Sequence, residues 1–98
     1  MTLPIKDPDE IITVEFDFTA LSSSVSTPVI TVQASYGKDD PSASAMLSGV
    51  PSVTGAEVRQ KIIGGQAGTT YTLRCVADAA DGSSYVLTAA LPVETFTP

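Results

Sequence analysis

Apolar and polar residues alternate along four stretches of the chain, with the period of two that is typical of half-buried β-strands. The apolar positions of these stretches are Ile12, Val14, Phe16 and Phe18; Ile30, Val32, Ala34 and Tyr36; Tyr71, Leu73, Cys75 and Ala77; and Tyr85, Leu87, Ala89, Leu91 and Val93. Weaker runs lie around Leu3–Ile5, Ala43–Leu47 and Glu57–Ile63. Helical periodicity is missing throughout. We therefore predict strands that each bury one face in a shared core.

Residues that favour turns separate these runs. They are Lys6–Asp9, Leu21–Ser24, Gly37–Pro41, Gly49–Ser52, Gly64–Gly68 and Asp78–Gly82, the last being a predicted hairpin loop with a positive φ at Gly82. Short strands with turns roughly every 8–12 residues are typical of Greek-key sandwiches. The sequence thus predicts an all-β fold, an immunoglobulin-like or fibronectin III-like Greek-key β-sandwich of about seven strands. We find no linker or repeat, so residues 1–98 are expected to form a single domain.

The segment Gly68–Leu73 places Tyr71 at the start of a core strand, just after a glycine-bearing loop. This pattern is typical of a tyrosine corner, in which the ring packs inside and the hydroxyl bonds a backbone group of the preceding crossover. The alternative is an ordinary strand tyrosine. Both interpretations favour a sandwich, and neither implies catalysis.

Charge narrows the classes of partner. Eleven acidic residues against five basic ones give a formal net charge of -6. Nucleic-acid binding depends on clustered Lys and Arg, and anionic membrane surfaces attract the same residues, so we expect neither partner. Because 43% of the residues are hydrophobic and only 16% are charged, the chain is not an acidic disordered segment. The charge favours solubility, with cation binding or a basic partner as the alternative.

Targeting and redox signals indicate a reducing compartment. The start, Met1–Pro8, lacks the basic and apolar regions of a signal peptide, and no run approaches the roughly 18 apolar residues of a membrane span. The chain has one cysteine, which excludes an internal disulfide. We expect the chain to be made in a reducing cytoplasm.

The residues give no support for an enzyme. Histidine is absent, which removes the commonest general base and transition-metal ligand. Cys75 alternates with core residues, so we expect it to be buried and inert. Gly64–Gly68 lacks the Lys and Ser/Thr of a phosphate loop, which leaves a flexible crossover as its expected role. We therefore predict no catalytic residue and no cofactor site.

The acidic residues of the turns are candidate calcium ligands. They are Asp7, Asp9, Glu10, Asp39, Asp40, Asp78 and Asp81. No Asp-x-Asp-x-Asp-Gly loop occurs, and aspartate routinely caps turns through nearby backbone groups. We therefore favour turn capping over calcium binding and predict no metal site.

Two segments carry a resemblance to a known family. Lys6-Asp7-Pro8-Asp9-Glu10, followed by a strand ending Phe16-Asp17-Phe18, resembles the opening of small immunoglobulin-like proteins encoded in tailed-bacteriophage genomes. Gly64–Leu73 is similar to that family's glycine-rich crossover and tyrosine strand. Those proteins often carry tryptophan where this chain has Phe18 and Ile30. The resemblance implies a non-enzymatic phage protein associated with the virion.

The leading hypothesis is a structural or accessory component of the virion, a head decoration, neck or tail part that acts through contacts with other virion proteins. Homo-oligomers are compatible with it, because sandwich modules associate through strand edges and sheet faces. A carbohydrate- or host-surface-binding module is the first alternative. The expected burial of Tyr36, Tyr71 and Tyr85 argues against it, since such sites use exposed aromatic rings. A small acidic inhibitor of a host protein is the second.

Overall fold

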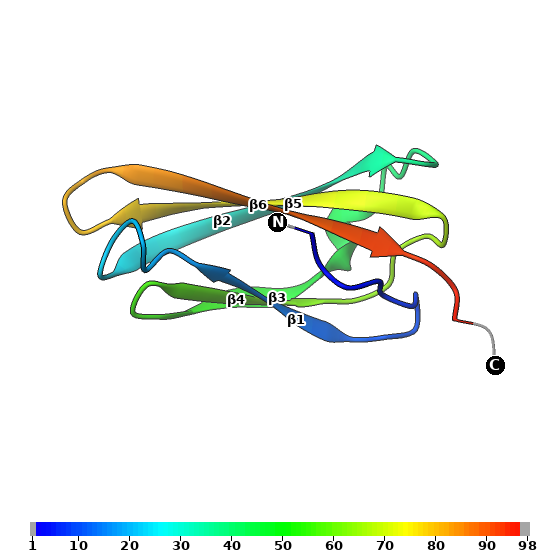
Figure 1. The fold of residues 1–98 in the computed structure, drawn as a ribbon, viewed down its shortest axis with the longest axis horizontal. Coiled ribbons are helices and arrows are strands. Elements are labelled where there is room, and N and C mark those ends of the chain that lie inside the picture. Colours follow the sequence, from blue (N-terminus) through cyan, green and yellow to red (C-terminus); the bar gives the residue numbers. More distant parts are fainter. Residues whose placement is uncertain (1, 97–98) are drawn as a thin grey trace.

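The computed structural model describes residues 2–96, which form two packed three-stranded β-sheets (Figure 1). The strands are β1 (Ile12–Asp17), β2 (Val25–Tyr36), β3 (Leu47–Thr54), β4 (Glu57–Ile62), β5 (Thr69–Ala79) and β6 (Ser84–Val93), with a short 3₁₀ helix, η1 (Ala43–Met46), before β3. The predicted all-β class is confirmed. Within these residues no helix has the length and apolar character that crossing a membrane requires.

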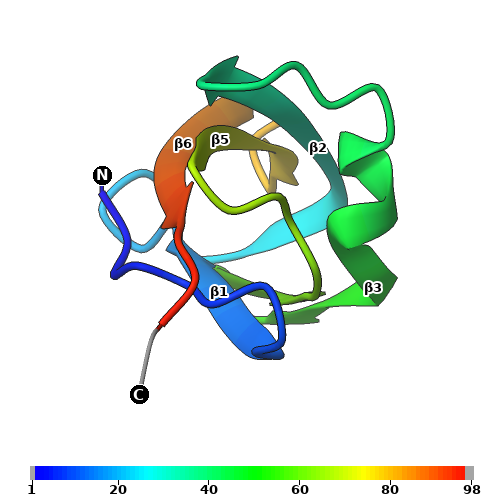
Figure 2. The same ribbon diagram turned by 90° about the vertical axis from the view of Figure 1, so that its right-hand side faces the viewer.

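The strand order is β1-β4-β3 in one sheet and β2-β5-β6 in the other, and all neighbours are antiparallel. The two sheets face each other, so that β2 contacts β3 along one side of the molecule. On the opposite side β1 lies below β6, and the N-terminal segment runs between them (Figure 2). This arrangement leaves β1 and β6 as the edge strands of the same side.

The core lies between the sheets, as the alternation predicted. Its fully buried apolar side chains are Phe16, Phe18, Val58, Ile62, Tyr71, Leu73, Cys75, Ala77, Leu91 and Val93. In β1 the side chains of Thr13, Glu15 and Asp17 are exposed, which confirms the predicted outer face. The predicted hairpin is also confirmed, because β5 pairs with β6 from Asp78 and Ser84 onwards.

The expected strand around Leu3–Ile5 is not a regular strand. Instead, Thr2 bridges Ala90 and Lys6 bridges Val93, both in parallel with β6. Two isolated bridges replace a continuous ladder because the segment follows β6 only over its last residues. The residues described here therefore contain six strands and one bridging segment, where about seven strands were predicted.

The prediction for residues 43–52 is wrong in its boundaries. Ala43–Met46 form the 3₁₀ helix and not a strand, and β3 runs through the predicted turn at Gly49–Ser52. The pairing of β3 with β4 is irregular between Ser48 and Ser52, and Gly49 has a φ of 72°. A bulge of this kind accommodates glycine and proline inside an edge strand.

The prediction that Tyr36 shares the buried face of its strand is also wrong. Its side chain is 79% exposed. The register of β2 against β5 shifts between Ala34 and Tyr36, and an extra residue in a strand reverses the direction of the side chains that follow it. The alternation therefore stops one residue before Tyr36.

Candidate functional site

Tyr71 has the packing and the bond that a tyrosine corner requires. Its ring is fully buried, and its hydroxyl accepts a hydrogen bond from the backbone N–H of Gln66 at 2.8 Å. The same hydroxyl donates to Oδ2 of Asp40 at 2.8 Å. Burial raises the pKa of Tyr71, and the hydrogen bond from Tyr71 lowers the pKa of Asp40. The hydroxyl of Tyr71 in β5 thus holds two loops together at one end of the sandwich.

The two segments that carry the phage resemblance meet in the structure. Lys6 is only 1% exposed, and its ammonium donates to the carbonyl oxygens of Asp7 at 2.9 Å and Gly64 at 2.7 Å. Burial lowers the pKa of Lys6. Gly64 begins the crossover from β4 to β5, so the lysine joins the opening turn to this crossover. No sequence signal predicted the contact, because charged residues are rarely buried.

The opening turn is built as the turn interpretation of its aspartates predicted. Asp7 Oδ1 accepts from the backbone N–H of Asp9 at 2.8 Å, and Asp7 Oδ2 accepts from that of Phe96 at 2.7 Å. Glu10 Oε1 accepts from the backbone N–H of Asp7 at 2.8 Å. These bonds to Asp9 and Phe96 lower the pKa of Asp7. The carboxylates therefore fix the chain where its two terminal segments come together.

Turn capping accounts for two further aspartates, whereas Asp78 lies in β5 and links the neighbouring strands β2 and β6. Asp40 Oδ1 accepts from the backbone N–H of Ser42 at 3.0 Å, and Asp81 Oδ1 accepts from that of Ser83 at 2.9 Å. Asp78 accepts from the hydroxyl of Thr27 and from Ser84 Oγ. Hydrogen bonds lower the pKa of all three carboxyl groups.

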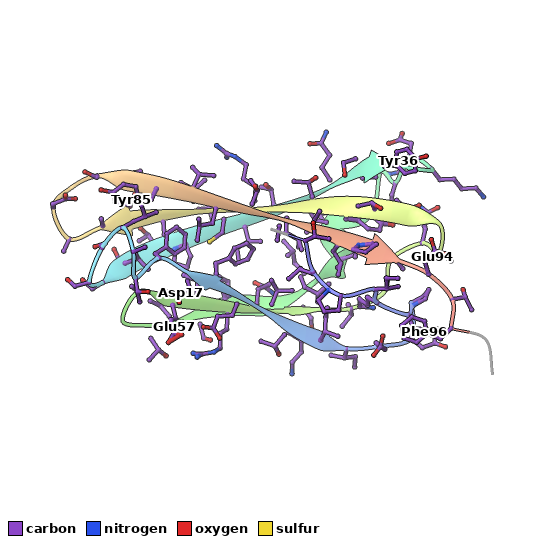
Figure 3. All side chains as sticks on the ribbon, in the orientation of Figure 1. Asp17, Tyr36, Glu57, Tyr85, Glu94 and Phe96 are labelled. Carbon is purple, nitrogen blue, oxygen red and sulfur yellow. The ribbon has the colours of Figure 1, made fainter. Side chains whose placement is uncertain are left out.

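A cluster that the sequence did not predict lies on the outer face of the β1-β4-β3 sheet. One carboxylate oxygen from each of Glu15, Asp17 and Glu57 lies within 4.8 Å of the other two. Asp17 and Glu57 are register partners, and Figure 3 shows them side by side. The pKa of Glu57 is raised by its hydrogen bond with Glu15 and by the negative charge of Glu15. We call these three residues the acidic cluster.

The acidic cluster is partly neutralised by Arg59. The arginine Nε lies 3.5 Å from Glu15 and its Nη2 lies 3.6 Å from Glu57. All of these groups are partly solvent-exposed, so each pair is worth only about 0–1 kcal/mol. The cluster is suited chemically to attracting a cation or a basic side chain. The sequence alone could not reveal the acidic cluster, because β1 and β4 are far apart along the chain and meet only when they pair in the sheet.

Cys75 lies where the alternation predicted. Its side chain has no exposed surface, and burial raises the pKa of the thiol to about 11. The thiolate is the reactive form, so this cysteine is inert at neutral pH.

Two of the larger open hollows on the surface of the sandwich adjoin the strands β3 and β6. One, of about 390 Å³, lies over the irregular part of β3 and is lined by Val50, Arg59 and Lys61 among others. The other, of about 420 Å³, lies between the two edge strands and is lined by Glu15 and Asp17 of β1 and by Val86, Leu87 and Thr88 of β6. The second hollow combines apolar surface with two members of the acidic cluster.

The sequence matches, over residues 6–92, the family described as podophage GP4 fiber-tail adaptor protein gp77. The chain belongs to this family. The match begins at Lys6 and ends at Pro92. The backbone N–H of Lys6 donates to the carbonyl of Pro92 at 2.9 Å, so a hydrogen bond joins the two ends of the matched region. The predicted phage origin and virion association are thereby confirmed, and the chain is a structural component of the phage tail. No curated protein matches the sequence.

Proposed function

We propose that this protein is a small adaptor that joins a fibre to the phage tail through protein–protein contacts. The family match carries this proposal, because it extends from the opening turn to the end of β6. A tail adaptor replaces the head-decoration and neck roles that the sequence also allowed. Its assembly with other virion proteins takes place in the host cytoplasm.

The proposal includes an immunoglobulin-like fold for residues 1–98 as a single domain. The orders β1-β4-β3 and β2-β5-β6 correspond to strands B-E-D and C-F-G of the constant-type immunoglobulin sandwich. Tyr71 then stands near the start of strand F, where the tyrosine corner of that fold occurs. The bridging segment before β1 takes the place of strand A.

The shape and charge of the molecule are suited to joining two partners. Its extents are 46 × 24 × 22 Å, so its two ends are far enough apart for separate contacts. Its net charge of -6 favours basic partner surfaces over nucleic acid or an anionic membrane. The adaptor needs no catalytic residue, cofactor or metal, and the absence of histidine fits a role without chemistry.

Interrupting the gene in the phage that encodes this chain tests the proposal. We expect particles with complete heads, necks and tails but without attached fibres, and fibre attachment restored when the chain is supplied from a plasmid. Quantitative mass spectrometry of purified particles measures the chain, and negative-stain microscopy counts the fibres. Normal fibres on particles that lack the chain would refute the proposal.

A further inference from the structure

We propose that the open edge of β6, at Ser84–Thr88, accepts an extended basic segment of a partner protein in the tail. The inference rests on the proposed function and deepens it, because it names the surface and the kind of segment that the adaptor binds. Strand addition of this kind supplies affinity through backbone hydrogen bonds and specificity through alternate side chains.

The chain already adds a segment to the same edge of β6, farther along the strand. The backbone N–H of Leu3 donates to Ala90 at 2.8 Å, and that of Lys6 donates to Pro92 at 2.9 Å. The N–H of Glu94 donates back to Lys6 at 3.0 Å. This edge therefore receives a parallel segment, but only over its last residues.

The first half of the edge is unpaired. Backbone groups of alternate residues in a strand point to the same edge, so those of Ser84, Val86 and Thr88 point the same way as those of Ala90. β6 pairs with β5 on its other side, and within residues 2–96 no segment pairs with Ser84–Thr88 on this side. Val86 is 42% exposed there. These unpaired backbone groups lie on the same edge of β6 as the groups that bond the N-terminal segment.

The other edge strands carry the features that prevent strand addition. β2 contains Pro28 and a register shift between Ser26 and Val29. β3 contains Pro51 within its own irregular region. β1 is short, with six residues, and exposes two carboxylates. Proline, bulges, charges and short length all blunt an edge, and Ser84–Ala89 has no proline, charge or register shift.

The surface beside this edge defines the chemistry of the incoming segment. Val86, Leu87 and Thr88 form one wall of the 420 Å³ hollow, and Glu15 and Asp17 form the other. A strand added to β6 directs alternate side chains toward β1. Lysine or arginine at those positions meets Glu15 and Asp17, the two members of the acidic cluster that line the hollow. The intervening positions of the incoming segment pack beside Val86.

Charge also argues against a second copy of this chain as the occupant. Two copies joined edge to edge at Ser84–Thr88 would bring their two acidic clusters to the same side of the molecule. Each copy carries a net charge of -6. Juxtaposed like charges oppose such pairing, whereas a basic segment relieves the repulsion.

The substitution Val86→Pro tests the proposal, with Val86→Thr as the matched control. Proline removes an N–H that points away from β5, and proline is tolerated in edge strands at such positions. Each variant is supplied from a plasmid to the phage with the interrupted gene, and copies per washed particle are measured by mass spectrometry. We expect Val86→Pro to lower retention about tenfold or more and Val86→Thr to leave it within about twofold.

A second variant tests the basic character of the segment. Glu15→Gln combined with Asp17→Asn removes the two charges that line the hollow from an exposed face, and we expect retention to fall about threefold to tenfold. Full retention of this variant, alongside loss of Val86→Pro, would contradict a basic occupant. Sedimentation showing dimers of the free chain that Val86→Pro abolishes would assign the edge to a second copy and overturn the proposal.

Hydrogen exchange of the unmodified protein keeps the test independent of how the variants fold. In tails, the amides of Val86 and Thr88 are expected to exchange about tenfold more slowly than in the free chain. Unchanged exchange, or full retention of Val86→Pro, would overturn the edge proposal while leaving the adaptor role intact. Absence of the unmodified chain from tails would instead refute the adaptor role.

Discussion

Replacing Tyr71 by phenylalanine removes one hydroxyl and disconnects two loops of the sandwich. The ring stays buried among core residues, so packing is preserved. The N–H of Gln66 loses its acceptor at 2.8 Å, and Asp40 loses a donor at 2.8 Å. An N–H left without a partner costs about 1–3 kcal/mol when buried.

Asp40 is partly exposed to solvent, so the lost bond at its carboxylate adds little to this cost. Water replaces the lost bond at Asp40, so we expect a loss of about 2 kcal/mol in the free energy of unfolding. For a domain of this size that corresponds to a fall of roughly 8–16 °C in Tm. The variant should still fold to the same sandwich.

Urea unfolding followed by far-UV circular dichroism measures the difference, because the chain has no tryptophan to report it. Tyr36→Phe is the matched control, since Tyr36 is 79% exposed and its loss of a hydroxyl should change stability by less than about 0.5 kcal/mol. If Tyr71→Phe were as stable as the control, the hydroxyl would not hold the loops together and the tyrosine-corner interpretation would fail.

Three further predictions follow from the structure. The pKa of Asp40 lies below its ordinary value of 3.8 in the folded chain. The bond from Tyr71 to this carboxylate therefore stabilises the fold above that pH, and this stabilisation is lost on acidification. In acid titrations, the difference in stability between the native protein and Tyr71→Phe should shrink below pH 4. Gly37→Ala should lower the free energy of unfolding by more than about 2 kcal/mol, because Gly37 has a φ of 95° and a Cβ there would clash with the backbone carbonyl oxygen of Gly68. Gly82→Ala, with open space around it, should lower the free energy of unfolding by only about 1 kcal/mol. Equal losses of the two variants in a thermal scan would contradict this. Cys75 should resist a thiol reagent at pH 8 in the folded protein and react at once in urea, and rapid labelling of the folded chain would show that the thiol is accessible.

Residue periodicity predicted those parts of the fold in which every position of a strand stays in register. In β5 the alternation from Tyr71 to Ala77 holds without interruption, and each inward side chain is buried. The alternation failed at Tyr36, where a bulge intervenes, and the turn predicted at Gly49–Ser52 is instead the irregular part of β3. A bulge depends on the partner strand, which single-sequence periodicity does not include.

The candidate surfaces were harder to predict, for a related reason. Turn aspartates such as Asp81 act on residues next to them in sequence, and their role was predicted correctly. The acidic cluster depends on the pairing of β1 with β4, and the Lys6–Gly64 bond joins residues 58 positions apart. Within residues 2–96, the open edge at Ser84–Thr88 follows from the strand order, which places β6 at the edge of its sheet. Such features follow from strand order and register, which emerge when the chain folds.

The central claim is that this chain joins fibre to tail, and a cryo-EM reconstruction of the phage tail tests it most directly. We expect density for a two-sheet sandwich of about 46 × 24 × 22 Å that contacts tail and fibre at once. Density for this chain on the head, or on the tail with no contact to a fibre, would contradict it.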